Sequence, residues 1–505
     1  ESDRMAFREW LKTKYVDLVS LNERWGNRFW SQWYDNWDQI DLPLPAPAYH
    51  NPALMLDYKR FISSSVISYQ KEQIDIIRKY RPDDFVTHNG TFKNIDYYEF
   101  CRDLDIYSHD NYPCFIPVPQ YPVGSNLTKA RGFKGRFMIM EQQTGPGGQT
   151  YLQRTPRPGE MSLWAFQAIA HGADGLLHFR WRTARQGAEE YWFGVLEQDN
   201  VPRARFEEFK KEGRQIQKIG PEILGSRIVS DLAVLKDFEA EWVFDYQYLT
   251  REVNLDAEYT DFFQAASELK YNLDFIGPQA AFSTYKRIIT PHLILMDEEL
   301  AKKIHDFVNG GGTFVLSAHS AVKDRDNGMT DQVPPIMLSE LFGVEREYFH
   351  CYQEPSREKN ALHFQDGTVI PIHVFADGLK IKTAKILATW DQDYLKGIPA
   401  CTENQSGKGK AVYYGSFFNL EAARYLIRRY AKEYQLNPIF ANFPKAVEVT
   451  RRTKDNKNFY FILNHADEEV RITPGSGYYD MLEDRPFPEH YTLRPYEYKI
   501  LRISK

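Results

Sequence analysis

The chain has 505 residues, of which 43% are hydrophobic, and a formal net charge of -6 at pH 7. This length suits two to four domains with large cores. The negative charge argues against a nucleic-acid partner, because nucleic-acid binders carry a basic patch. No stretch approaches the ~20 apolar residues that a membrane span needs, so we expect no membrane partner. We also expect a cytoplasmic location. Aromatic residues reach 15%, which fits either a large core or a protein that stacks rings on sugars.

The first region, residues 1–221, alternates helical and strand patterns. It opens inside an amphipathic helix over residues 4–15, with no Met before it, and we therefore expect that an N-terminal portion is missing. A long helix is predicted over 51–80. Four short apolar strands follow, at residues 85–89, 104–109, 137–141 and 175–181. Repeated strand–helix units predict parallel strands with right-handed crossovers.

Four such units amount to half of an eight-stranded barrel. Half a barrel would leave two long strand edges exposed, which soluble proteins avoid. We therefore predict a (β/α)8-type barrel of which this sequence holds the C-terminal half, with the other strands upstream. An open sheet is the alternative.

Two further regions follow the first. Residues 222–437 alternate strands and helices, and the pattern predicts a doubly wound parallel sheet. Residues 438–505 alternate apolar and polar residues between turns such as Pro474-Gly475, which is typical of a small β-sandwich. The predicted order is thus a partial barrel, an α/β domain and a β-sandwich.

Polar and aromatic residues gather where the four strands of the first region end. They are His88, Asn89, His109, Asp110, Asn111, Tyr112, Glu141, Gln142, Arg180, Trp181 and Arg182. The carboxyl ends of parallel barrel strands share one rim, and barrel enzymes place their chemistry there. Glu141 is the most informative of them, because it follows an apolar run and precedes a Gly/Pro loop. The simpler interpretation is that these residues cap strands and fill the space between barrel and helices.

Several motifs resemble one family. Residues 21–32, LNERWGNRFWSQ, resemble the LNxxWGxxFWSQ segment of the glycoside hydrolase family 42 β-galactosidases. Other segments resemble the family in the same order, namely residues 140–142, 157–161, 171–175, 179–182 and 187–189. The second and third regions resemble the family's amidotransferase-like trimerisation domain and its C-terminal β-domain.

The resemblance implies a retaining exo-β-galactosidase that acts on terminal β-D-galactosyl residues of small galactosides or oligosaccharides. Glu141 matches the nucleophile, which would form a covalent glycosyl-enzyme. The family's acid/base Glu belongs to an Asn-Glu pair at a strand end upstream of the FWS segment. No such pair precedes Trp30, so we expect the acid/base upstream of this sequence. Two carboxylates suffice for this chemistry, so we expect no cofactor and no metal.

The resemblance also assigns residues to the sugar pocket. Trp30 matches a tryptophan that lines the galactose pocket, and Tyr112 would hydrogen-bond the nucleophile's carboxylate. Phe179 and Glu189 match positions that contact the sugar, with Glu189 accepting from hydroxyl groups.

Two positions in the pocket wall depart from the family. Gln149 stands where the family commonly has Trp, and Trp192 stands where it often has His. A related glycosidase with another sugar, such as an α-L-arabinopyranosidase, is therefore an open alternative. A non-catalytic sugar-binding or scaffold relative is another.

The middle region raises the possibility of a second active site. Amidotransferases of this fold carry a Cys nucleophile at a strand-to-helix elbow, whereas here the strand is followed by Ser317-Ala318-His319-Ser320. With no Cys at the elbow, we expect an assembly scaffold that forms a homotrimer.

Overall fold

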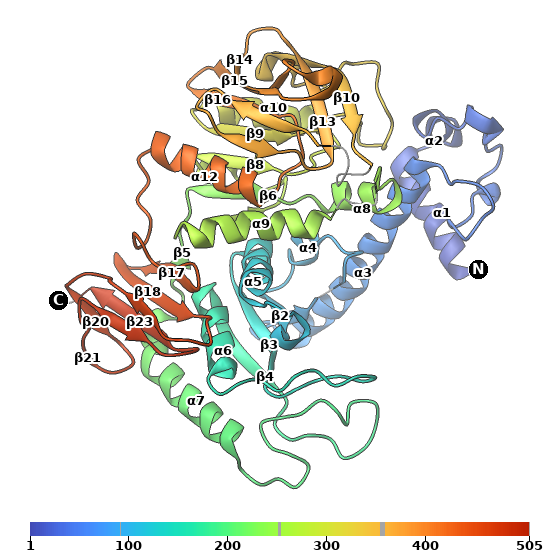
Figure 1. Ribbon diagram of the computed structural model, residues 1–505. Coiled ribbons are helices and arrows are strands. Elements are labelled where there is room, and N and C mark those ends of the chain that lie inside the picture. Colours follow the sequence, from blue (N-terminus) through green and yellow to red (C-terminus); the bar gives the residue numbers. More distant parts are fainter. Residues whose placement is uncertain (91, 251–253, 354–358, 504–505) are drawn as a thin grey trace.

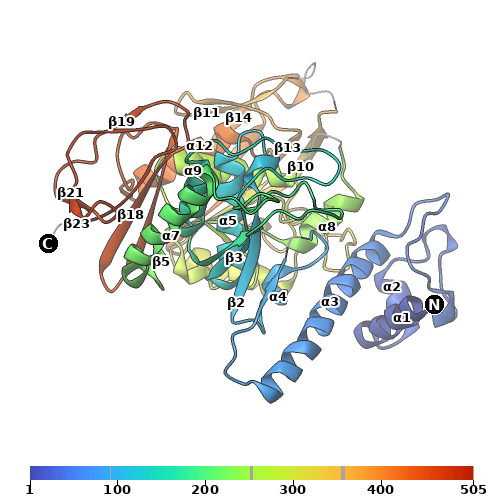
Figure 2. The ribbon, with the colours of Figure 1, turned by 90° about the horizontal axis from the view of Figure 1, so that it is seen from below.

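The computed structural model describes residues 1–505 except 91, 251–253, 354–358 and 504–505 (Figure 1). The chain opens with α1 (Ser2–Tyr15), α2 (Leu18–Arg24) and the long helix α3 (Pro52–Tyr80). The Asn51 side chain accepts from the backbone N–H of Ala53 and Pro52 takes the first helical position, so the start of α3 is specified locally. In Figure 2, α3 reaches from the body of the molecule to α1 and α2, which project beside it.

Four parallel strands form the first sheet in the order β1-β2-β3-β4. They are β1 (Thr87–Asn89), β2 (Ile106–Asn111), β3 (Phe137–Gln143) and β4 (Ala173–Phe179). The helices between and after them are α4 (Tyr97–Phe100), α5 (Gln120–Lys134), α6 (Glu160–Ala170) and α7 (Ala204–Ile223). The prediction of parallel strand–helix units is confirmed. The prediction that the third strand ends at Glu141 was wrong by two residues, because the strand pairing continues through Gln143.

The middle domain is built on nine strands in the order β12-β11-β14-β15-β16-β9-β8-β6-β7. The parallel strands are β6 (Leu232–Leu235), β7 (Asp274–Ile276), β8 (Arg287–Thr290), β9 (Thr313–Ser317) and β16 (Gly409–Tyr414). The antiparallel strands are β11 (Ala361–Phe364), β12 (Val369–Pro371), β14 (Lys385–Trp390) and β15 (Pro399–Ser406). A wholly parallel sheet was therefore a wrong prediction. Strands joined by short turns pair antiparallel, whereas parallel neighbours need a crossover helix.

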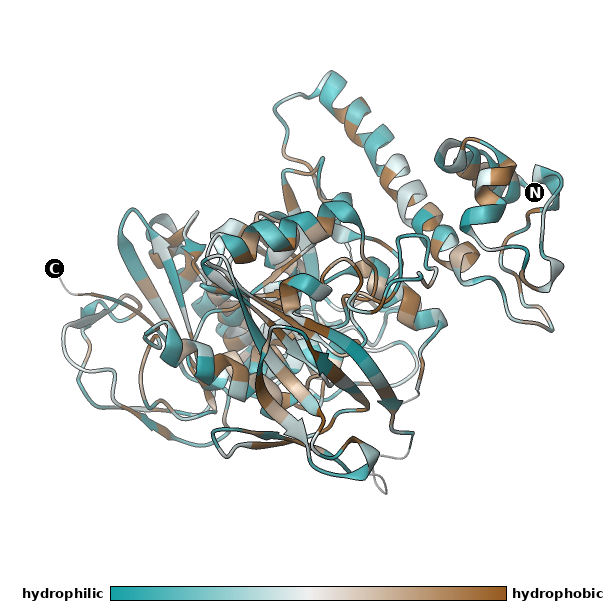
Figure 3. Ribbon diagram, turned by 90° about the horizontal axis from the view of Figure 1, so that it is seen from above, coloured by the Kyte–Doolittle hydropathy of each residue, from teal (hydrophilic) through white to brown (hydrophobic). Residues whose placement is uncertain are grey.

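Helices and one extra ribbon cover the middle sheet. The helices are α8 (Phe238–Tyr246), α9 (Leu255–Glu268), α10 (Glu298–Asn309), α11 (Ser339–Phe342) and α12 (Leu420–Glu433). The ribbon pairs β10 (Val344–Cys351) with β13 (Phe375–Ile381). Figure 3 shows hydrophobic residues concentrated along interior strands, while α3 alternates hydrophobic and hydrophilic stretches as an amphipathic helix does.

The last domain contains a six-stranded sheet and a two-stranded one. The larger sheet contains β5 (Arg227–Ile228), β17 (Val447–Lys454), β18 (Lys457–Asn464), β20 (Tyr478–Asp480), β21 (Arg485–Pro486) and β23 (Tyr498–Ile503). The smaller sheet pairs β19 (Val470–Ile472) with β22 (Tyr491–Leu493). Strand β5, which precedes the middle domain in the chain, pairs with β17. The six-stranded sheet of the last domain therefore includes a segment from before the middle domain.

Across the described residues, none of the helices has both the length and the apolar character required to cross a membrane.

Candidate active site

The carboxyl ends of β2 and β3 bring together two acidic residues. Asp110 on β2 lies opposite Glu141 on β3 in parallel register, after an irregularity between His109 and Asp110. The carboxyl ends of parallel strands meet at one edge of a sheet, which is where barrel enzymes place catalytic groups. Tyr112 follows β2 directly and so lies at the same edge.

A hydrogen bond joins Tyr112 to Glu141. The Tyr112 hydroxyl donates a short hydrogen bond to Oε2 of Glu141. Burial raises the pKa of Tyr112 far above its ordinary value, and the Glu141 carboxylate raises it further, so the phenol keeps its proton at neutral pH. Glu141 itself is half-buried. The pair therefore presents one carboxylate oxygen held by a neutral donor.

Asp110 is the second carboxyl group at this edge. Both of its carboxylate oxygens lie 2.8 Å from Nδ2 of Asn89, at the end of β1. Burial raises the pKa of Asp110 to about 6, and the nearby negative charge of Glu141 adds to the increase. A carboxyl group with a raised pKa at a strand end is a common feature of acid/base sites.

Four aromatic rings form a wall beside Glu141. The Trp192 ring lies 4.8 Å from Tyr112, 5.5 Å from Phe115 and 5.9 Å from Phe179, measured between centroids. A Cβ atom at Gly147 would lie 2.6 Å from Cε3 of Trp192, so the loop after β3 needs a glycine at this point. We call these four rings the aromatic wall; they belong to Tyr112, Phe115, Phe179 and Trp192. The aromatic wall connects the ends of β2 and β4 to two loops.

Glu189 lies next to the aromatic wall. It forms an ion pair with Arg180, whose guanidinium carbon is 4.5 Å from the centroid of Phe179. About half of the Glu189 side chain is exposed. The carboxylate is thus oriented by an arginine and keeps a face open to solvent.

The structure does not bring all the predicted rim residues together. His88 turns away from Asn89 and contacts Gln70 of α3, with 2.7 Å between its Nδ1 and the amide oxygen. This follows from the alternation of side chains along a strand. Trp181 packs against Phe206 and Phe209 of α7.

Trp30 lies in another part of the molecule. It lines a cavity shared by the N-terminal segment and the middle domain, and no member of the aromatic wall lines that cavity. Its assignment to the galactose pocket stays a prediction.

The sequence interpretation missed Phe115 and the links between strand ends. Pro113 begins a single helical turn (Pro113–Phe115) that places Phe115 beside Tyr112. The side-chain oxygen of Gln143 accepts from the N–H of Cys114 at 2.9 Å, which ties the end of β3 to this turn. The Tyr-Pro dipeptide after a strand was the available signal, because proline at the first position favours such a turn.

The described part of the chain contains no group of three or more His, Cys, Asp or Glu side chains positioned to hold a metal ion. Cys101, Cys114 and Cys401 are buried free thiols.

The strand-end carboxylates, the aromatic wall and the barrel-type sheet together are typical of a glycoside hydrolase. A family model described as β-galactosidase matches residues 1–219. The models for the β-galactosidase trimerisation domain and C-terminal domain match residues 230–437 and 446–502. The chain therefore belongs to glycoside hydrolase family 42, the β-galactosidases, and the predicted order of the three domains is confirmed.

Individual relatives agree with this assignment. β-Galactosidase BgaA of Clostridium cellulovorans is 31% identical over 98% of this chain and 76% of its own length. The bgaB enzyme of Geobacillus kaustophilus is 31% identical over 94% of this chain and 70% of its own. The crystal structure of β-galactosidase from Bacillus circulans sp. alkalophilus superposes with a TM-score of 0.93, at 29% identity, over 99% of this chain and 76% of that one.

The family match begins at residue 1 and gives no support to the prediction of an incomplete barrel. That prediction is not needed for the family assignment.

Proposed function

We propose that the protein is a retaining exo-β-galactosidase in which Glu141 is the nucleophile, acting on terminal β-D-galactosyl residues of small galactosides. The observation that carries the proposal is the hydrogen bond from Tyr112 to a carboxylate at the carboxyl end of a parallel strand, in a chain of the β-galactosidase family. The Tyr112 hydroxyl donates to Oε2 of Glu141 and so fixes the orientation of the carboxylate that would attack the anomeric carbon.

The proposed reaction has two steps. In the first, a Glu141 oxygen bonds to the anomeric carbon while the bond to the leaving oxygen breaks, and an acid gives that oxygen a proton. In the second, water adds to the anomeric carbon, the ester bond to Glu141 breaks and the water's proton returns to the same group. Phe179 and Glu189 are proposed to contact the sugar, with Glu189 accepting from its hydroxyl groups.

The proton donor is proposed to be a second carboxyl group about 5–5.5 Å from Glu141, as retaining enzymes require. Asp110 is proposed as a neighbouring carboxyl group and not as this donor. Adjacent parallel strands place it beside the nucleophile, whereas the donor must reach the leaving oxygen.

Chemical rescue tests the nucleophile. Glu141→Gly should lower hydrolysis of an aryl β-galactoside by at least 1,000-fold, about 4 kcal/mol. Added azide should restore turnover and yield the α-configured galactosyl azide, because azide enters the space left by the carboxylate. Glu190→Gly, at an exposed position, is the control. A β-configured azide product would assign Glu141 to the acid/base role instead.

Gln149 and Trp192 differ from the residues common at these positions in the family. The sugar specificity should therefore be measured on two substrates. The kcat/KM for aryl β-D-galactopyranoside should exceed that for aryl α-L-arabinopyranoside, which lacks the hydroxymethyl group. The reverse order would support the arabinopyranosidase alternative, and inactivity on both would support a non-catalytic relative.

Assembly is proposed to be a homotrimer formed through the middle domain, supported by the match to a trimerisation domain. The proposed domain limits are 1–221, 222–437 and 438–505. Light scattering of this chain should give three times 59.2 kDa, or about 178 kDa. A mass of one or two chains would contradict the proposal.

A further inference from the structure

Strand β17 of the last domain faces the turn that connects α6 to β4. Helix α6 packs against β17 and β18 (Figure 1). Alternate residues of β17 direct their side chains at this turn, as the alternation along a strand requires. They are Glu448, Thr450 and Arg452. Three side chains of the last domain therefore hold one short segment of the first region, residues 169–174.

Arg452 makes four hydrogen bonds, three of them to the turn. Its Nη1 donates to the carbonyl oxygens of Ile169 at 2.6 Å and Ala173 at 3.2 Å. Its Nη2 donates to the carboxylate of Asp174 and to the carbonyl oxygen of Ser226, at 3.0 Å each. Arg452 is 1% exposed, so water does not compete for these bonds. A planar guanidinium fixes the direction of the groups it binds as well as their distance. The end of α6 and the start of β4 are thus held at a set separation.

The end of α6 requires donors of this kind. The last carbonyl groups of a helix have no partner farther along the helix, and the C-terminus carries a partial negative charge that favours a cation. Ile169 and Ala170 are the last two residues of α6. Their carbonyl oxygens accept from Arg452 and, at 2.9 Å, from Oγ1 of Thr450. A strand of another domain therefore completes the C-terminus of α6.

The pairing of β4 with β3 is irregular. The register shifts twice within residues 137–142 of β3, and each irregularity interrupts the hydrogen bonds that would set the height of β4 along β3. Thr144 ties the carboxyl end of β4 to the chain after β3, because its Oγ1 donates to the carbonyl oxygen of Phe179 at 2.9 Å. Arg452 supplies a tie at the other end, where β4 begins at Ala173.

Strand β4 leads directly to two positions that are proposed to contact the sugar. Phe179 is the last residue of the strand, and Arg180 after it forms an ion pair with Glu189. Glu141, in contrast, lies on β3, and the four bonds of Arg452 go to other segments. A shift of β4 along β3 would therefore move the sugar contacts and leave the nucleophile in place.

We propose that Arg452 is a positioning residue for the catalytic pocket, acting through the α6–β4 turn to fix the height of β4 against β3. The inference rests on the proposed function, because it concerns the positions of Phe179 and Glu189 relative to a bound galactoside. The last domain thereby sets the shape of the pocket from the amino-terminal end of β4, at the opposite end of the strand from the site.

Steady-state kinetics of Arg452→Met test the proposal. Methionine fills similar space and removes all four hydrogen bonds. KM for an aryl β-galactoside should rise roughly 10-fold while kcat changes less than about three-fold, because the sugar contacts move and Glu141 does not. A loss of folded protein alone would instead lower kcat and leave KM unchanged, since the remaining molecules would bind normally. Arg452→Lys keeps the charge and one donor group, so KM should rise only about two- to three-fold.

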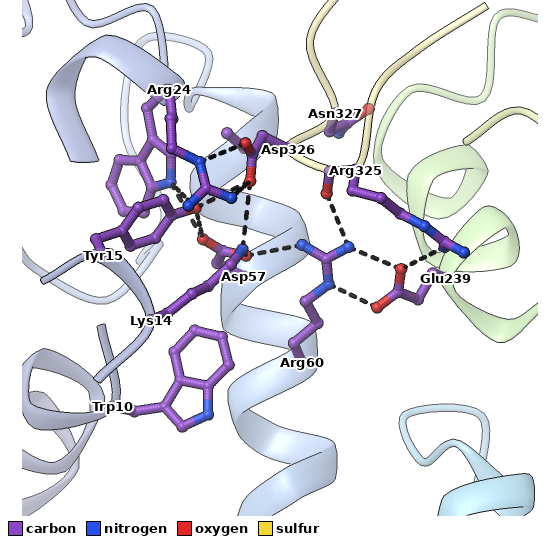
Figure 4. Close-up of polar contacts among 12 residues, drawn as sticks. Trp10, Lys14, Tyr15, Arg24, Asp57, Arg60, Glu239, Arg325, Asp326 and Asn327 are labelled. Atoms are coloured by element: carbon purple, nitrogen blue, oxygen red, sulfur yellow. Dashed lines mark hydrogen bonds and ion pairs between the residues drawn. The ribbon is translucent and has the colours of Figure 1, made fainter. Parts of the chain in front are cut away.

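Arg60→Met is the matched control. Arg60 of α3 belongs to another network of ion pairs between domains, in which it donates to both oxygens of Glu239 of α8 at 2.6 and 2.7 Å (Figure 4). Arg325 binds the same carboxylate at 3.0 Å, and Asp57 accepts from Arg60 at 3.0 Å. The substitution therefore breaks a comparable arginine clamp that does not bind the α6–β4 turn. It should lower stability as Arg452→Met does, yet keep KM within about two-fold.

Amide hydrogen exchange locates the effect of Arg452→Met. Exchange should accelerate in residues 173–179 of β4 more than in residues 137–143 of β3, because only β4 loses its anchor. Equal acceleration in the two strands, an unchanged KM in folded Arg452→Met, or an equal rise of KM in Arg60→Met would overturn the inference and leave the proposed function intact. An unsubstituted protein that hydrolyses no aryl β-galactoside would overturn both.

Discussion

At the scale of single residues, the site depends on how charge is placed around Glu141. Tyr112 gives the carboxylate a neutral donor, while Asp110 adds a second negative group on the adjacent strand. The Glu141 carboxylate therefore has a neutral hydrogen-bond donor and a second carboxyl group as its neighbours.

Tyr112→Phe isolates the donor. The substitution keeps the ring in the aromatic wall and removes only the hydroxyl that bonds Glu141. A hydrogen bond to a charged group contributes about 1.5–3 kcal/mol, so kcat should fall roughly 10- to 100-fold with a smaller change in KM. Steady-state kinetics on an aryl β-galactoside measure this, with Tyr69→Phe as the control. An unchanged kcat would show that the bond plays no part in the reaction.

Asp110→Asn should change the dependence of stability on pH. The folded-state pKa of about 6 exceeds the ordinary value of 3.8, so between these values the folded protein holds a proton that the unfolded chain releases. Stability from Asp110 therefore falls as pH rises from about 4 to 6 and is constant above. The Asn variant does not lose stability in this way. Between pH 4 and 6, its melting temperature relative to that of the unsubstituted protein should therefore rise by about 1–2 °C, a value that allows for the partial exposure of Asp110. Melting curves that shift in parallel at all pH values would contradict the assignment.

At the scale of elements, the loop after β3 decides the shape of the aromatic wall. Gly147 approaches the Trp192 ring more closely than any side chain would allow, and Gly145 similarly faces Phe193. The Gly/Pro composition of this loop was visible in the sequence. Its packing partner was not, because Trp192 lies 45 residues downstream and reaches the loop only after β4 has paired with β3.

Gly147→Ala should displace the indole of Trp192. The added Cβ would lie 2.6 Å from the ring, a contact that cannot persist. We expect kcat/KM to drop about 10-fold, which corresponds to ~1.4 kcal/mol, while the fold is retained. Gly213→Ala is the matched control, because Gly213 lies within α7 with open space around its Cβ position. It should leave activity unchanged and stabilise the helix by about 0.5–1 kcal/mol. Equal activity of the two variants would refute the proposed role of the loop.

At the scale of the whole molecule, one buried carboxylate joins the first region to the last domain. Glu448 of β17 bonds His171 after α6, and it also bonds Gln167 and His465 at 2.8 Å each. The two histidines hold the pKa of Glu448 well below its ordinary value, against the effect of burial. His171 is the first residue of segment 171–175, which resembles the family. This segment therefore helps to hold the first region against the last domain.

Glu448→Ala should loosen this interface. Removal of one partner of a buried ion pair leaves the others unpaired and costs about 3–5 kcal/mol. The lowered pKa means that the stabilisation is present above about pH 4.3 and is lost as pH falls further. The difference in unfolding free energy from the unsubstituted protein should thus shrink in acid. Denaturant unfolding at pH 7 and pH 4 measures it, with the exposed Glu469→Ala as control. A cost below 0.5 kcal/mol at pH 7 would contradict the docking role.

The sequence alone determined the number and order of the domains, the parallel strand–helix units and the position of Glu141 near a strand end. These features depend on periodicity, turn residues and motifs that act over a few neighbouring positions. Only the tertiary structure decided the antiparallel half of the middle sheet, the contact of Tyr112 with Glu141, the aromatic wall around Trp192 and the separate cavity at Trp30. The last three join residues well separated in the chain, and strand register and packing, which no local pattern encodes, set which of them meet.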